Sequence, residues 1–596
     1  MTIKLFVHSQ KAANVAMNQT SLAIKHKNKH PNYTFWLFVL ASVLIFIGIG
    51  LRDPWPADEP RFAQVAKEMV ETGQWFFPAR AEEFYPDKPP VFMWSIAFFF
   101  ALFGSIKIAF LLPSALCSLL TLFLVYDISK RLWSTKEALI ATSLLLLSFQ
   151  FLLQAKSAQI DAMVCCWITI GCYGLLRFFL VERRWRWYYL AFFFMGIGVI
   201  TKGVGFLPVL MLIPYLIHRR VWPQRDIAKK QTKNSVLPWI MGAVVMLLAI
   251  SLWFIPMLIL VENSHDPSLA LYRDNILFRQ TVTRYADSWH HIKPFWYYLV
   301  EVIPLFWLPI SIALPWLIPF WYSAIKKGDA RILLPLGWIV LVLLFFSVSP
   351  GKRGVYILPA LPMLALISAP YFDSVVNKKV FSWLLWGVVF LLSVGLLGFG
   401  FSGIVEASFA LKLEEKFGLS PWMFFLVTGG LTCLVTVITS RGKHWKAWPY
   451  FLCTLWGMYA TWGYTLLEDV KTPKSVFGNI EKEIGKHDAT IALVDFSEQF
   501  ILFSPYPIVH FGYHTPTDEQ LSAAYQWMEK TDKGRYILVD EKHVRNDCFK
   551  KEMATSVGYA HRVHWVLLSH EALTEKCPLT RTTTEIFSYI PDRPVT

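Results

Sequence analysis

Thirteen apolar runs limit what this chain can fold into. A segment that crosses a bilayer must pair its own backbone N–H and C=O groups, as an α-helix does, and it needs about 20 apolar residues. Several runs are shorter than that, so their ends are not sharply defined. The runs lie near residues 34–51, 107–128, 137–153, 160–181, 187–200, 203–218, 237–262, 299–322, 331–348, 354–372, 381–403, 421–439 and 447–467. We therefore expect an α-helical polytopic membrane protein.

The composition supports this class and narrows the function. Hydrophobic residues make up 55% of the chain, charged residues 17%, and the mean hydropathy is +0.42, which is typical of a membrane protein rather than a soluble enzyme. The net charge of +15 does not indicate nucleic acid binding, because much of the Lys and Arg lies in short loops between apolar runs. In such loops basic residues set orientation and attract anionic membrane lipids.

Basic clusters follow alternate apolar runs and predict the orientation. They lie at 130–136, 183–186, 219–230, 326–331, 378–379 and 441–446. The positive-inside rule places these loops in the cytoplasm. This requires 91–128 to cross only once, so 91–104 is expected to be re-entrant, juxtamembrane or the broken start of the second helix. The prediction is about thirteen transmembrane helices, with the N-terminus inside and the C-terminus outside.

The two ends of the chain differ from the apolar middle. The first 34 residues carry five Lys and no Asp or Glu, and they lack the apolar core and cleavage site of a signal peptide. We therefore interpret 1–33 as a basic cytoplasmic tail; Met17 is an alternative start. A transmembrane domain is expected over 34–467, with large external loops at 52–90 and 263–298.

Residues 468–596 are expected to form a small external α/β domain. Short β-like runs at 491–496, 508–511, 536–539 and 563–568 alternate with helical runs at about 474–486 and 517–530. Two cysteines, Cys548 and Cys577, lie in this region, where an oxidising compartment would allow them to pair.

Polar side chains gather on the predicted outer side of the membrane. Ionisable groups at a membrane boundary are costly and tend to mark a site, although each one also has a structural explanation, such as a helix cap or a snorkelling lysine. Carboxylates can orient sugar hydroxyls or act as bases, and Lys and Arg suit phosphate groups. Together they suggest a lipid-linked phosphate substrate. The set comprises Asp58, Glu59, Arg61, Asp87, Lys88, Asp161, Lys202, Arg273, Arg279, Arg284, Lys352, Arg353 and Tyr356.

An ordered series of motifs carries a family resemblance. The stretch ADEPRFAQVAKEMVETGQW at 57–75, followed by YPDKPPVFMW at 85–94, resembles the first external loop of GT-C membrane glycosyltransferases that use polyprenyl-phosphate sugars. The resemblance is closest to the bacterial lipid A aminoarabinose transferases and more distant to protein O-mannosyltransferases. Further matches are RLW at 131–133, SAQIDAM at 157–163, TKG at 201–203, PFWYYL at 294–299 and GKRGVYILPALPMLAL at 351–366.

This resemblance implies a GT-C fold with external juxtamembrane helices and assigns roles to residues. Asp58 would be the central catalytic carboxylate, accompanied by Glu59 and Asp161. The donor phosphate would be held by Arg61, Lys88, Lys202, Lys352 and Arg353, with Tyr85, Asp87 and Tyr356 lining the cavity. The acceptor would meet Arg273, Arg279 and Arg284. Two departures stand out: Asp87 replaces the usual Glu, and 351–354 reads Gly-Lys-Arg-Gly instead of Ser-Lys-Leu-Pro.

The resemblance further implies an inverting transfer at the periplasmic side of the bacterial inner membrane. The donor would be a sugar such as aminoarabinose on undecaprenyl phosphate, and the acceptor lipid A phosphate or another periplasm-facing group. No cofactor is assigned, and a divalent metal is left open. Two alternatives are protein O-glycosylation with the same donor and a lipid or glycan flippase, although no internal repeat of the transporter kind is evident.

The loop charges generate a topology prediction. A reporter that is active only in the periplasm should be active when fused after residue 470 and silent when fused after residue 222, because the basic clusters hold their loops in the cytoplasm. Reporter activity in whole cells measures this. The opposite pattern of activity would invert every loop assignment.

Overall fold

The computed structural model describes residues 32–225, 235–277, 292–485, 489–531, 534–544, 547–575, 577–578 and 584–591. By its internal contacts the chain divides into two units, residues 1–42 and residues 43–596. The elements that build the candidate site all lie in the second unit.

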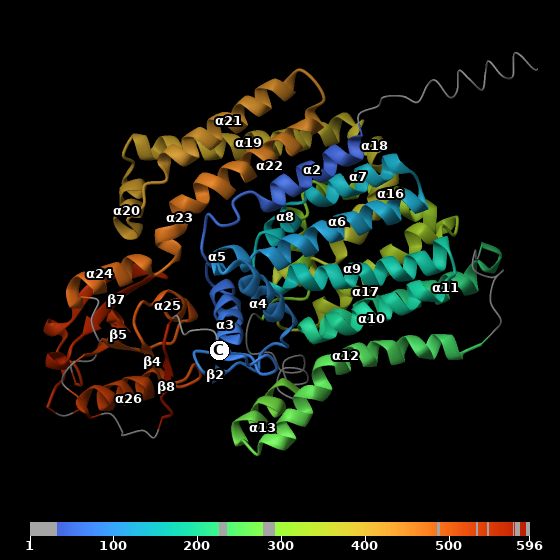
Figure 1. Cartoon of the computed structure of the whole chain (residues 1–596). Helices are drawn as coiled ribbons and strands as arrows, with labels where there is room; N and C mark the ends of the chain where they lie inside the picture. The colour runs from blue at the N-terminus through green and yellow to red at the C-terminus, as the bar shows by residue number, and fades with distance from the viewer. Residues whose placement is uncertain are drawn as a thin grey trace, which may run out of the picture. The chain divides into compact units, whose positions relative to one another are not determined.

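Helices dominate the chain up to residue 484 (Figure 1). The α-helices are α2 (Tyr33–Phe46), α3 (Glu59–Thr72), α4 (Val91–Phe103), α5 (Ile106–Ala109), α6 (Leu112–Leu132), α7 (Thr135–Leu146), α8 (Phe149–Ala155), α9 (Ile160–Leu176), α10 (Trp185–Lys202), α11 (Leu212–Val221), α12 (Leu237–Ser264), α13 (Pro267–Asp274), α15 (Ile303–Phe306), α16 (Ile310–Lys326), α17 (Ala330–Val348), α18 (Ala360–Val376), α19 (Lys379–Ile404), α20 (Ser408–Phe417), α21 (Trp422–Ser440), α22 (Ala447–Met458), α23 (Tyr464–Lys471) and α24 (Lys474–Ile484). Short 3-10 or π segments are η1 (Arg177–Val181), η2 (Val204–Met211), η3 (Pro223–Arg225), η6 (Tyr298–Val302), η7 (Gly354–Ile357), η8 (His444–Lys446) and η9 (Tyr459–Gly463).

The expected class of helical membrane fold is borne out, whereas the count of thirteen spans stays a prediction. Within the described residues, seven helices are long and apolar enough to cross a membrane, or nine if each of two bent pairs counts as one span. The bends, of 70° and 110°, lie between α7 and α8 and between η6–α15 and α16. Other predicted runs coincide with helices that are shorter, such as α2 and α18.

The segment 91–104 is separate from the helix that follows it. Helix α4 has 13 residues and ends at Gly104, whose φ of 66° is left-handed. Glycine adopts that conformation without strain and commonly stops a helix there. Helices α5 and α6 then supply the long apolar span at Ile106–Leu132. Segment 91–104 is thus a helix of its own, and whether it is re-entrant, juxtamembrane or the broken start of the second span stays a prediction.

Helix α9 lies at the centre of the helical part. It packs against α6, α10 and η2 (Figure 1). In the span formed by α9 and η1, 83% of the most apolar stretch is buried, compared with 22% in α12. Small residues allow the closest approach: a Cβ added to Gly205 of η2 would lie 2.2 Å from the carbonyl carbon of Gly198. Such small-residue contacts are typical of packing between membrane helices. The less buried helices leave apolar side chains outward, as a lipid environment requires.

A six-stranded mixed sheet follows residue 489. Its order is β6-β7-β5-β3-β4-β8, and β3 pairs in parallel with both β4 and β5. The strands are β3 (Thr490–Leu493), β4 (Ile508–His510), β5 (Arg535–Asp540), β6 (Thr555–Ala560), β7 (Val563–Leu568) and β8 (Phe587–Tyr589). Strands thus occur at all four predicted runs, and α24 and α26 (Thr517–Glu529) at both helical ones. The boundaries of the predicted domains stay predictions.

Helices cover both faces of this sheet. Alternate residues of a strand point to opposite faces. Accordingly Ile491 and Leu538 pack with α24 and α25 (Glu498–Phe503) in one apolar cluster, whereas Ala492 and Ile537 pack with α26 in another. The C-terminal region therefore has an apolar core on each side of its sheet.

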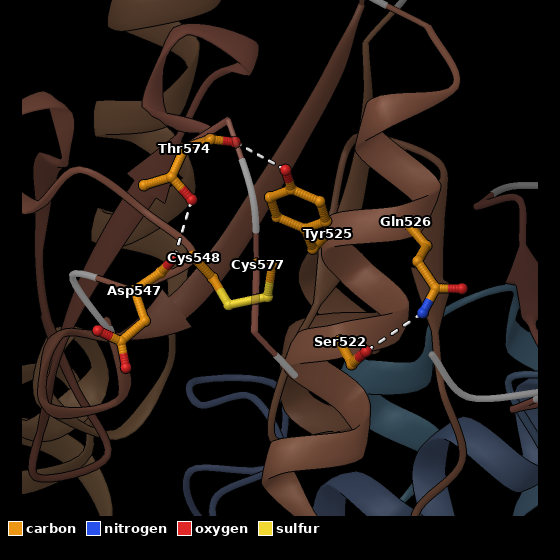
Figure 2. The surroundings of a disulfide bond; sticks show 7 residues. All are labelled: Ser522, Tyr525, Gln526, Asp547, Cys548, Thr574 and Cys577. Carbon is orange, nitrogen blue, oxygen red and sulfur yellow. Dashed lines mark hydrogen bonds between the residues drawn. A yellow bond between two sulfur atoms is a disulfide. The ribbon is translucent and has the colours of Figure 1, made fainter. Parts of the chain in front are cut away.

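The expected disulfide is present in this region. Cys548 and Cys577 are bonded, with their Cα atoms 4.3 Å apart (Figure 2). The Tyr525 hydroxyl donates to the Thr574 carbonyl at 2.7 Å, and the Thr574 hydroxyl donates to the Asp547 carbonyl at 2.9 Å. The first bond fastens the segment before Cys577 to α26, and the second joins the two bridged segments to each other.

Removing the bridge should lower the stability of the C-terminal region. The bonded cysteines are 29 residues apart, and a loop of that length is worth roughly 3 to 4 kcal/mol of unfolding free energy in the chain-entropy account. Cys548→Ser should therefore lower the thermal unfolding temperature of the full-length protein in detergent, as should Cys577→Ser. The control is Cys433→Ala, which removes a free thiol. Ready labelling of both Cys548 and Cys577 in folded, unreduced protein would contradict the bond.

Candidate active site

Asp58 connects three segments that are far apart in the sequence. It immediately precedes α3, and its side chain makes no capping bond to that helix. Instead, one carboxylate oxygen accepts hydrogen bonds from an Arg353 terminal amino group at 3.0 Å and from the Gln159 amide at 3.4 Å. The Asp58 side chain keeps 18% exposure. The Asp58 carboxylate is therefore fixed by hydrogen bonds and still accessible, which suits it to contact a substrate.

A second ion pair adjoins the first. The Lys202 ammonium group is bonded to the Asp161 carboxylate and lies 4.7 Å from the centre of the Tyr356 ring. Burial disfavours the charge of Arg353, but the Asp58 carboxylate and, to a smaller extent, Asp161 raise its pKa above the ordinary value. Four charged residues and one tyrosine, predicted from four separate motifs, thus form one group.

Glu59 is enclosed by protein contacts. Its carboxylate forms a two-point ion pair with the Arg52 guanidinium, at 2.5 and 2.8 Å, and accepts the backbone N–H groups of Trp55 and Ala158, each at 2.9 Å. Both charged side chains are buried. These contacts fasten the start of α3 to the segment after α8. The predicted catalytic role of Glu59 is untested, and its contacts are those of a positioning group.

Lys156 was missed by the motif analysis. It is buried, its ammonium group donates to the Ile47 carbonyl, and its own carbonyl accepts from Arg52 at 3.0 Å. Burial, and after it the charge of Arg52, lowers the pKa of Lys156 to about 7. The only sequence signal is a lysine at the end of an apolar run, directly before the SAQIDAM motif.

Arg61 faces the C-terminal region. Its Nε donates to the Glu498 carboxylate at 2.6 Å, and Arg80 donates to the same oxygen at 2.9 Å. The Tyr85 ring lies 5.9 Å from the Arg61 guanidinium carbon and 5.1 Å from that of Arg80. Burial raises the pKa of the Tyr85 hydroxyl well above its ordinary value. Sequence reasoning found Arg61 and Tyr85 but not their partners, because Glu498 is 437 residues away from Arg61.

A short hairpin presents Arg80 and Tyr85. Strands β1 (Ala79–Arg80) and β2 (Glu83–Phe84) are joined by Ala81 and Glu82, both at positive φ. The buried Glu68 carboxylate accepts both turn N–H groups at 2.7 Å each, which compensates for this unusual backbone. Burial raises the pKa of Glu68 to about 7.

The hairpin is also fastened to the C-terminal sheet. The buried His510 Nε2 lies 2.8 Å from the Ala81 carbonyl oxygen, and the Tyr513 backbone N–H donates to Glu83 at 2.8 Å. Burial lowers the pKa of His510 to about 4, so it is neutral at physiological pH. The 52–90 segment and the C-terminal region are therefore in direct contact around Arg61.

The remaining predicted cations make other contacts. The Lys88 ammonium donates to the Asp87 carbonyl at 3.0 Å, and the buried Lys352 donates to the Lys293 carbonyl at 2.8 Å. Arg273 pairs with Glu262 at 3.0 Å and with its neighbour at 2.9 Å. Their predicted roles are untested.

Two predicted acceptor residues, Arg279 and Arg284, lie outside the described residues. Within the described part of the chain, no three His, Cys, Asp or Glu side chains are grouped so as to hold a metal ion.

The fold is that of the GT-C class of membrane glycosyltransferases. The structure superposes on crystal structures of ArnT from Cupriavidus metallidurans, one bound to undecaprenyl phosphate and one in the apo state, with TM-scores of 0.69 and 0.67. The first covers 92% of this chain and 100% of that one, at 18% identity. This likeness establishes the fold.

Sequence comparison gives more particular relatives. The family described as dolichyl-phosphate-mannose-protein mannosyltransferase matches residues 87–255. The undecaprenyl phosphate-alpha-4-amino-4-deoxy-L-arabinose arabinosyl transferase 1 of Pseudomonas fluorescens is 32% identical over 56% of this chain and 58% of its own length. The transferase of that name, without the number, from Shewanella sediminis is 26% identical over 78% and 82%.

The first of these relatives is thus matched over less than two thirds of its length. The resemblance to glycosyltransferases that use polyprenyl-phosphate sugars, predicted from the motifs, is confirmed.

The contacts of Glu59 lead to a test of its role. Glu59→Gln leaves the buried Arg52 without its counter-charge, a change that typically costs about 3 to 5 kcal/mol. The expected result is a clearly lowered unfolding temperature of the purified protein. Glu301→Gln, which removes a half-exposed carboxylate, is the matched control. An unchanged unfolding temperature together with lost activity would make Glu59 a catalytic residue instead.

Proposed function

We propose that the protein is an inverting glycosyltransferase of the bacterial inner membrane. It transfers a sugar such as 4-amino-4-deoxy-L-arabinose from undecaprenyl phosphate to a periplasm-facing acceptor, of which lipid A phosphate is the best supported. The observation that carries the proposal is the joining of Asp58–Arg353 to Asp161–Lys202, within a fold and a set of relatives of this class.

The donor requires cations at its phosphate. As the glycosidic bond breaks, its electron pair passes to the phosphate oxygen of undecaprenyl phosphate, and nearby positive charge stabilises that oxygen. Arg61 lies on α3 beside Asp58, and Lys88 lies three residues after Tyr85, whose ring approaches Arg61. We assign these two cations to the donor phosphate. The names of the relatives, which contain undecaprenyl phosphate, support this donor.

Asp58 acts on the acceptor side of the reaction. Arg353 and Gln159 fix the direction of its carboxylate. A phosphate acceptor is already anionic, so its oxygen can attack the anomeric carbon from the face opposite the leaving phosphate without a base. Asp58 then positions the acceptor or the amino group of the sugar. Asp161 orients Lys202, and Glu59 holds Asp58 and the 157–159 segment in register.

A hydroxyl acceptor on a protein is the second candidate. It is favoured by the match of residues 87–255 to a protein mannosyltransferase family. A hydroxyl must lose its proton as it attacks, so Asp58 would then act as a general base. The mass of intact lipid A, compared in cells with and without the protein, distinguishes the two acceptors. A flippase would change neither lipid A nor protein masses by a sugar.

Removing the charge of Asp58 or Lys88 should abolish transfer without affecting folding. Asp58→Asn keeps the shape of the side chain, and Lys88→Ala removes a cation from the donor phosphate. Loss of such an electrostatic contact typically lowers the rate on the order of 100- to 1000-fold. Sugar transfer from a limiting amount of donor, measured by mass spectrometry, checks both variants.

The control is Asp373→Asn. Asp373 pairs with Lys136, and the two side chains are 47% and 67% exposed, so this change should be near neutral. If Asp58→Asn retained most of the activity, its carboxylate would be structural, and the reaction centre would have to be sought around Asp161.

A further inference from the structure

One buried carboxylate from the C-terminal region serves two arginines of the first external loop. Glu498, at the start of α25, accepts from Arg61 at 2.6 Å and from Arg80 at 2.9 Å through the same oxygen. The Arg80 side chain is 2% exposed and that of Glu498 is 9% exposed. Helix α25 also packs directly on α3. The contact is therefore part of a buried interface between α3, the hairpin and α25, and it is not a surface ion pair.

The charges of this contact do not balance. Two guanidinium groups share one carboxylate, so the three side chains of this contact together carry one positive charge. Glu83, the hairpin partner of Arg80, is bonded to the Tyr513 backbone N–H at 2.8 Å. The Arg80 Nε is buried and has no hydrogen-bond partner within the described residues. Buried charges and buried N–H groups are costly when left without partners, so the contact is suited to take up an anion.

Aromatic rings lie close to both guanidinium groups. The Tyr513 ring lies 3.7 Å from the Arg80 guanidinium carbon and 5.9 Å from that of Arg61. Rings stack on the flat faces of a guanidinium, whereas its N–H groups point outward in its plane. The Glu498 contact engages the Nε of Arg61, so that carboxylate does not use the two terminal amino groups. These are the groups that bind a phosphate at two points.

We propose that the C-terminal region completes the donor-phosphate site, with Glu498 as a positioning residue for Arg61 and Arg80 as a second cation for the phosphate group. This inference rests on the proposed function, because Arg61 is a donor-phosphate residue only there. Arg61 lies three residues after Asp58, on the same side of α3. The ligand class is a polyprenyl phosphate, either the sugar donor or the product without its sugar.

Two variants of Glu498 separate its geometry from its charge. Glu498→Ala removes the acceptor that orients Arg61, and it should weaken the binding of undecaprenyl phosphate to the full-length protein roughly tenfold, the scale of one charge-assisted bond. Glu498→Gln keeps an oxygen for Arg61 and removes the negative charge. It should bind undecaprenyl phosphate at least as tightly as the unmodified protein. Native mass spectrometry of the detergent-solubilised protein measures both.

A kinetic readout and a matched control complete the test. Glu498→Ala should raise the KM for the sugar donor more than it lowers kcat, a split that a general loss of folding would not produce. Glu483→Gln, which removes an exposed carboxylate of α24 in the same region, should leave binding and kinetics unchanged. Inorganic phosphate should compete with undecaprenyl phosphate, and undecaprenol should not, if the phosphate group is what is recognised.

The outcomes separate this inference from the proposed function. Wild-type binding by Glu498→Ala, or weaker binding by Glu498→Gln, would overturn the role of Glu498. Competition by undecaprenol would overturn the assignment of a phosphate site. If the unmodified protein bound no undecaprenyl phosphate at all, the proposed function itself would fail.

Discussion

The buried pair of Arg52 and Glu59 holds the segments around Asp58 together. Because the Arg52 guanidinium also donates to the Lys156 carbonyl and Glu59 accepts the Ala158 N–H, the pair joins the first loop to the turn between α8 and α9. That turn carries Gln159 and leads into Asp161. A buried ion pair contributes little net stability but is costly to break, which makes it suited to fixing geometry. The placement of Asp58 beside Asp161 follows from it.

The fold was largely accessible from the sequence because its signals are local. Apolar runs mark the helices, and short β-like runs such as 563–568 mark strands of the C-terminal sheet. The number of membrane spans was harder to predict from the sequence. Bends such as that between α7 and α8 are set by how neighbouring helices pack, and hydropathy along one segment does not record this. Helix α4 was anticipated only through the charge of loops far from it.

The candidate site likewise contains residues that the sequence motifs identified and residues that they did not. Asp58, Asp161, Lys202, Arg353 and Tyr356 each lie in a motif, and the structure brings these motifs together. Glu498, Arg80 and Lys156 lie in no motif. Their importance comes from which side chain they meet across the fold, and a single sequence carries no sign of such pairs. The resemblance also predicted a catalytic role for Glu59, which is next to Asp58 in the sequence. In the structure the Glu59 carboxylate accepts four hydrogen bonds from other protein groups.

The distance in sequence between Arg61 and Glu498 has a consequence for biosynthesis. Arg61 and Glu498 are separated by 437 positions, and the seven described helices that are long and apolar enough to cross a membrane lie between them. These helices are therefore synthesised before Glu498, the partner of Arg61 and Arg80, leaves the ribosome. Until then Arg61 and Arg80 have no Glu498 to hold them. The contact between the first loop and α25 can therefore form only after these helices have been synthesised.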